Sequence, residues 1–165
     1  MKLIVNLFAL LIILFTGLLT NAEPLKAGVS IDSVPDTFFG SWRVVAKIDK
    51  QKGETYFKPI AIDLWNLSRQ GNVINLTNPF TGASASVNVE YAEGNLIRFT
   101  KTGNYDGNKK LTDTVDLKLM GDTFTGINTL TLETYSNFDN SLIRKDSAIY
   151  ILKGEKVSGE SITGN

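Results

Sequence analysis

Apolar and polar residues alternate with a period of two over most of the chain from Phe38 onward. Alternation is clearest in segments 42–49, 83–91 and 112–119, where Val45 is the one apolar exception. This period is typical of strands that bury one face. Nowhere do apolar residues recur at helical spacing over the length that a stable helix needs. The pattern predicts an all-β domain.

Turn residues divide the pattern into eight strands. Gly71-Asn72, Gly94-Asn95 and Gly121-Asp122 each precede a new apolar run and suit tight hairpins, and residues 78–82 form a longer proline- and glycine-containing turn. The strands are predicted at 40–49, 57–69, 72–77, 83–92, 95–101, 110–119, 123–133 and 142–153. Such a meander leaves exposed edges unless it closes, which favours an eight-stranded antiparallel up-and-down barrel. A β-sandwich is the alternative, but it needs longer crossover connections.

The amino-terminal segment has the pattern of a cleavable secretion signal. Lys2 precedes an apolar run over residues 3–19, and small residues stand at the proposed cleavage site after Ala22. An uncleaved membrane anchor is the alternative, although no basic flank follows the run. We therefore expect a signal at 1–22, a flexible leader at 23–36, a barrel at 37–154 and a tail at 155–165. The expected localisation is secreted or periplasmic, with no membrane anchor after cleavage.

Composition narrows the range of functions. The 165 residues suffice for one domain, and the 17 basic and 17 acidic residues balance. Loss of Lys2 with the signal leaves a net charge of −1, so nothing in the overall charge would attract nucleic acid. The chain has no cysteine and no histidine, which removes thiol chemistry, histidine-based triads and the usual transition-metal ligands. We expect neither an enzyme nor a cofactor or metal site.

The sharpest local motif begins the first predicted strand. Residues 39–45 read Phe-Gly-Ser-Trp-Arg-Val-Val, which resembles the first-strand G-x-W motif of the lipocalins and the wider calycin group. The resemblance implies a calycin/lipocalin-like barrel whose closed end is built by Gly40 and plugged by Trp42. It also implies a cation on the last strand against this tryptophan, a role assigned to Arg144. The turn at 120–122 keeps only the Asp of the lipocalin T-D-Y-type turn, and the chain after the eighth strand is too short for the usual helix.

One face of the predicted strands offers candidates for a ligand-binding interior. The candidate ligand-binding residues combine this inward face with aromatic residues near the first connection: Phe57, Trp65, Asn66, Val87, Phe99, Asn128 and Tyr150. Ile62, Leu64 and Asp113 are placed on the same inward face, and Asp63 on the solvated one. Buried amides such as Asn66 and Asn128 would need partners, and a ligand could supply them. The alternative is that these residues simply fill a solid core.

These observations favour a non-catalytic barrel that carries a small apolar or amphipathic ligand. The alternative is a solid-core module that contacts another macromolecule through its loops or through the threonine-rich face of Thr123, Thr125, Thr129 and Thr131. The ligand's identity and the oligomeric state do not follow from the sequence.

Overall fold

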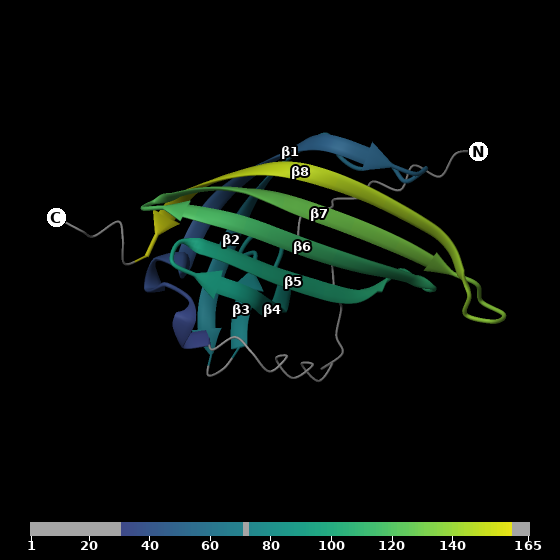
Figure 1. The fold of residues 1–165 in the computed structure, drawn as a ribbon, viewed down its shortest axis with the longest axis horizontal. Helices are drawn as coiled ribbons and strands as arrows, with labels where there is room; N and C mark the ends of the chain where they lie inside the picture. The colour runs from purple at the N-terminus through teal and green to yellow at the C-terminus, as the bar shows by residue number, and fades with distance from the viewer. Residues whose placement is uncertain (1–30, 71–72, 160–165) are drawn as a thin grey trace.

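The computed structural model describes residues 31–70 and 73–159, which form a closed barrel of eight antiparallel strands in sequence order (Figure 1). The strands are β1 (Gly40–Lys52), β2 (Ile60–Gln70), β3 (Val73–Thr77), β4 (Ser84–Glu93), β5 (Leu96–Tyr105), β6 (Lys109–Met120), β7 (Thr123–Tyr135) and β8 (Leu142–Ser158). The predicted all-β, up-and-down barrel is confirmed. None of the helices among these residues is long and apolar enough to cross a membrane. The predicted signal lies outside the described residues.

Closure of the barrel depends on a long pairing between β1 and β8. The two strands run antiparallel from Ser41 opposite Ser158 to Lys52 opposite Ser147, with register shifts near each end. β8 therefore continues to Ser158, four residues beyond the expected end of the barrel at Gly154. The additional residues of β8 pair with the first residues of β1, so part of the expected tail belongs to the barrel wall. This pairing closes the sheet.

Two short 3₁₀ turns precede β1 and lie at one end of the barrel, η1 (Ile31–Ser33) and η2 (Asp36–Phe38). Ile31, Val34 and Phe38 are buried there, and the Phe38 ring lies 6.0 Å from that of Phe99. The described part of the expected leader thus packs its apolar side chains against the barrel. This end is the closed end of the molecule.

The glycine and tryptophan of the first-strand motif build the closed end. Gly40 has φ +120°, and a Cβ there would stand 2.4 Å from the Ser158 carbonyl oxygen, so only glycine permits this approach of β8. The fully buried Trp42 donates its indole N–H to the Phe38 carbonyl at 2.9 Å. Its ring packs 5.1 Å from that of Phe124. Gly40 thus permits the close approach of β8, and Trp42 is packed inside this end of the barrel.

The cation that covers Trp42 is Lys156, and the expectation for Arg144 is wrong. Lys156 Nζ lies 4.8 Å from the centre of the Trp42 ring and donates to the carbonyls of Thr37 and Phe39 at 2.6 and 2.9 Å. Arg144 is at the opposite end of β8, where it pairs with Glu54 and Asp146. The reason for the difference is that β8 is longer than expected. Lys156 belongs to the added residues, which pair with the start of β1.

The alternation of inner and outer side chains departs from the expected pattern in two strands. In β2 the inner residues are Ala61, Asp63, Trp65 and Leu67, so the inward expectation for Ile62, Leu64 and Asn66 is wrong by one residue. Ile62 is 69% exposed. In β4, a register shift between Val89 and Tyr91 turns Tyr91 outward. Such a bulge inserts one residue and reverses the alternation beyond it.

Candidate ligand-binding interior

The inside of the barrel has two different halves. Towards the closed end, large aromatic side chains fill it: Trp65 packs against Phe124 and Phe99, with ring centres 5.8 and 6.3 Å apart. Towards the opposite end, five inner positions carry alanine, namely Ala46, Ala61, Ala83, Ala85 and Ala148. The larger buried side chains of Phe57, Leu130 and Tyr150 lie in the same half. We call this the open half.

A buried polar cluster lies on the wall of the open half, where β5, β6 and β7 run side by side (Figure 1). Asp113 of β6 is opposite Lys101 of β5, and Asn128 of β7 is fully buried beside it. The Asn128 side-chain amide donates to Asp113 Oδ1. In this orientation the amide oxygen, Asn128 Oδ1, is buried and has no hydrogen-bond partner among the described residues.

Burial dominates the electrostatics of this cluster. It raises the pKa of Asp113 to about 7, against the smaller lowering effects of the Asn128 hydrogen bond and the Lys101 charge. Burial also lowers the pKa of Lys101, and the charge of Asp113 opposes that change. Each group is thus shifted towards its neutral form by the loss of water. A ligand that formed hydrogen bonds to the charged forms of these groups would bring the pKa of Asp113 down and that of Lys101 up again.

A second inner carboxyl, Asp63 of β2, lies on the opposite wall of the barrel. Its Oδ1 accepts hydrogen bonds from the Leu64 backbone N–H at 2.9 Å and from the Asn78 side chain, while its Oδ2 is buried without a partner. Burial raises its pKa, against the Leu64 bond and the nearby Trp65 indole N–H, which completes no hydrogen bond. The expectation that Asp63 is solvated is wrong, because β2 presents the other face to the interior.

Asp63 and Asp113 belong to strands that are four apart in the closed barrel. Asp63 is opposite Val44 of β1, and Asp113 lies between Lys101 of β5 and Leu130 of β7. The two carboxyls therefore come from opposite walls.

The loop between β1 and β2, residues 53–59, closes part of the open end. Phe57 is buried, and the Tyr150 hydroxyl donates to the Lys58 carbonyl at 3.0 Å. The buried Asp146 anchors the loop by accepting from the Thr55 hydroxyl and from the Glu54 backbone N–H. Gly53 has φ +102°, and a Cβ there would lie 2.0 Å from Asp146 Oδ1, so glycine is required beside the anchor.

The structure brings most of the predicted site residues to the inside of the barrel. Phe57, Asn128 and Tyr150 belong to the open half, and Trp65, Val87 and Phe99 to the interior that packs towards the closed end. Asn66 faces outward, where it accepts a weak hydrogen bond of 3.5 Å from the Ser41 hydroxyl. Lys101 was not among the predicted residues, although its place two residues after Phe99 puts it on the same face.

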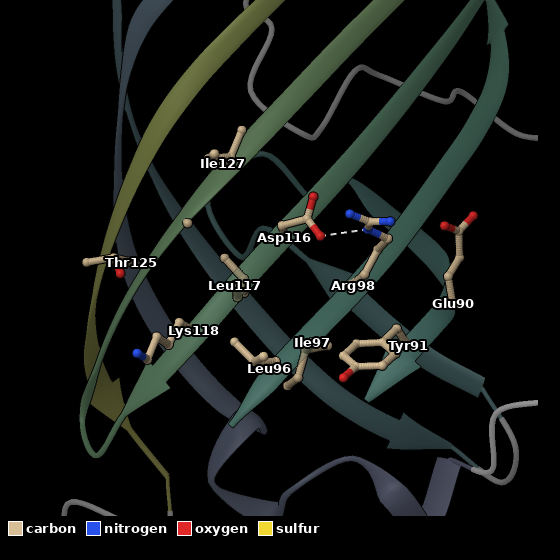
Figure 2. A pocket seen from close by; sticks show the side chains of 11 residues that line it. Glu90, Tyr91, Leu96, Ile97, Arg98, Asp116, Leu117, Lys118, Thr125 and Ile127 are labelled. Atoms are coloured by element: carbon tan, nitrogen blue, oxygen red, sulfur yellow. Dashed lines mark hydrogen bonds and ion pairs between the residues drawn. The ribbon is translucent and has the colours of Figure 1, made fainter. Parts of the chain in front are cut away.

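The outer wall carries an open groove of about 770 Å³ across β4 to β7. Figure 2 shows Arg98 and Asp116 turned towards one another above the strands, with 2.6 Å between Arg98 Nε and Asp116 Oδ1. Leu96, Ile127 and Tyr91 contribute partly exposed apolar surface to this groove. It is separated from the inner polar cluster by the wall itself.

Comparison with protein-family models, with curated proteins and with solved structures finds no match to the chain. The fold therefore defines the class of protein at a coarse level only. It is an eight-stranded antiparallel up-and-down barrel, and its closed end, open half and G-x-W strand fit a calycin-like fold.

Proposed function

We propose that this protein is an exported, non-catalytic barrel that binds a small amphipathic ligand in its open half. The observation that carries the proposal is the buried and unpartnered Asn128 Oδ1 among small inner side chains. An unpaired buried acceptor costs about 1–3 kcal/mol, and a solid core would avoid it. A ligand with a polar end and an apolar body would supply the missing hydrogen bond and cover the alanines.

The arrangement of the two halves supports this proposal. The large aromatic rings that pack against one another are gathered in the closed half, while alanines occupy five inner positions of the open half. The loop 53–59 is tied to Asp146 by polar contacts at its first residues, while Phe57 reaches inside. Polar tethers of this kind exchange with water more easily than buried apolar packing, which suits a segment at the entrance of a site.

A second candidate is an interaction module, and the outer groove favours it. Leu96, Tyr91 and Ile127 expose apolar surface beside charged residues, a composition found in protein contact surfaces. This function would not require a ligand inside the barrel, so an internal binding test separates the two candidates.

The test uses phenylnaphthylamine, an uncharged probe that fluoresces in apolar surroundings. We expect the folded protein to take it up, and Ala148→Trp to weaken uptake by about tenfold because the larger ring occupies the open half. Ser147→Trp, one residue away on the outer face, is the matched control and should change uptake by less than about twofold. Ala85→Leu, with Ser86→Leu as its control, is a smaller version of the same comparison.

Stability provides a second measurement on these variants. If the open half holds a ligand, Ala148→Trp should leave the free energy of unfolding within about 1 kcal/mol of the wild type, whereas overpacking a solid core costs about 1–3 kcal/mol. Absence of probe uptake by the folded wild type, together with a large loss of stability in Ala148→Trp, would contradict internal binding. The interaction-module function would then be favoured.

A further inference from the structure

The ionisable side chains inside the open half do not balance in charge. Among the described residues, the carboxyls of Asp63 and Asp113 face inward there, and Lys101 is the ammonium on the same surface. Asp146 is also buried, but Arg144 and Thr55 already pair with it. With both carboxyls ionised, the interior carries one more negative than positive charge.

Two of the unpaired buried atoms are acceptors, and they come from opposite sides of the barrel. Among the described residues, Asp63 Oδ2 and Asn128 Oδ1 are buried without a hydrogen-bond partner, and the Trp65 indole N–H beside Asp63 is a buried donor without one. On the wall of β6, Asn128 already uses its amide nitrogen on Asp113. That wall therefore offers a ligand an acceptor at Asn128 Oδ1.

Three kinds of polar end can be compared at this place. A carboxylate would be attracted by Lys101 but repelled by Asp113 and Asp63, and it brings no donor. A hydroxyl brings one donor and no charge. An ammonium brings three donors and the opposite charge, and charge-assisted hydrogen bonds are about twice as strong as neutral ones.

We propose that the ligand is a protonated amine on a compact apolar body, with its ammonium held by Asp63 or by the Asp113–Asn128 pair. This inference rests on the proposed function, since it names the chemical class of the ligand in the same site. The apolar body would lie against the alanines and Leu130, which faces the interior beside Asp113.

The experiment compares three molecules that share one chain and differ only in the polar end: hexylammonium, hexanol and hexanoate. Calorimetric titration at about pH 7.5, above the Asp113 pKa of about 7, measures binding to the full-length folded protein. We expect hexylammonium to bind about tenfold more tightly than hexanol, and hexanoate to bind most weakly. Competition with phenylnaphthylamine reports whether each molecule occupies the same site.

Variants then assign the effect to the two carboxyls. Asp63→Asn and Asp113→Asn should together remove the preference for hexylammonium, and at least one of them alone should weaken its binding by about tenfold. Neither should change hexanol binding by more than about twofold. Asp116→Asn, on the outer face of the same strand as Asp113, is the control and should change nothing.

The outcomes separate this inference from the proposed function. If hexanoate binds as tightly as hexylammonium, or if hexanol binds equally well, the inference about the amine is wrong while internal binding stands. If none of the three molecules nor phenylnaphthylamine binds, the proposed function itself fails. The three-molecule series on the wild type decides between these cases even if a variant does not fold.

Discussion

At the scale of single residues, burial and not charge pairing sets the chemistry of the interior. Asp113 is held in its protonated form up to about pH 7 because water is removed from it, although Asn128 and Lys101 both favour the anion. The same loss of water lowers the pKa of Lys101, because its charged form is the protonated one. The result is a pair of ionisable groups whose charges depend on what else enters the barrel.

This shift predicts an unusual dependence of stability on pH. Between the ordinary pKa of Asp near 3.8 and its folded value of about 7, the folded protein holds a proton on Asp113 that the unfolded chain has lost. The contribution of Asp113 to stability is therefore fully present below pH 3.8 and is lost as the pH rises to about 7. The total change is at most about 4 kcal/mol.

Asp113→Asn removes the titration while keeping the shape of the side chain. We expect its free energy of unfolding, relative to that of the wild type, to be higher at about pH 7.5 than at about pH 5. Urea unfolding at the two pH values measures this difference. Asp116→Asn, which loses an exposed ion pair worth less than about 1 kcal/mol, should show no such trend. Equal behaviour of the two variants would contradict the buried state of Asp113.

At the scale of elements, the long strands and the loops around the open end have different roles. β8 spans the barrel and carries Lys156 against Trp42 at one end and Asp146 against the loop 53–59 at the other. One strand therefore supports both the closed base and the entrance. The loop depends on a polar anchor and on one glycine, which makes it the easiest element to perturb by itself.

Gly53→Ala tests the anchor of this loop. The new Cβ would collide with Asp146 Oδ1 and would also be strained at φ +102°, so we expect faster amide exchange over 53–59 and a loss of about 1–3 kcal/mol. Gly121→Ala is the matched control, because Gly121 also has a positive φ but has open space around its Cα. If the two variants lose the same stability and the exchange of the loop is unchanged, Asp146 does not anchor it.

At the scale of the whole molecule, closure between β1 and β8 pairs the first and last strands of the meander, and the turns η1 and η2 cover the closed end. The barrel does not indicate where the protein acts, and only the amino-terminal segment bears on it. That segment is the basis of the export proposal.

The export proposal predicts where the mature protein begins. If residues 1–22 are a cleaved signal, amino-terminal sequencing of the protein released by its own host should start at or within a few residues of Glu23. A change of Ala22 to Phe should slow processing, because the cleavage site needs a small side chain, while Glu23→Gln should not. Recovery of an intact Met1 form in the membrane fraction would contradict cleavage.

The amino-acid sequence by itself determined the class of fold and the eight strands. These follow from local rules: period-two alternation identifies strands, and glycine-containing turns separate them. Val87, Phe99 and Asn128 were placed inward for the same reason, since their strands have one apolar face. The unpartnered oxygen of Asn128 was not visible, because it depends on a neighbour in another strand.

Only the tertiary structure decided which face of β2 is inner, which cation covers Trp42 and which carboxyls share the interior. β2 carries large apolar residues on both faces, so alternation cannot choose between Asn66 and Asp63, and pairing of Trp65 with Trp42 makes the choice. Lys156, and not Arg144, covers Trp42 because the pairing of β8 with β1 continues beyond the strand end that the alternation predicts. Asp63 shares the interior with Asp113 because β2 turns its Trp65 face inward and barrel closure brings the two distant strands onto opposite walls.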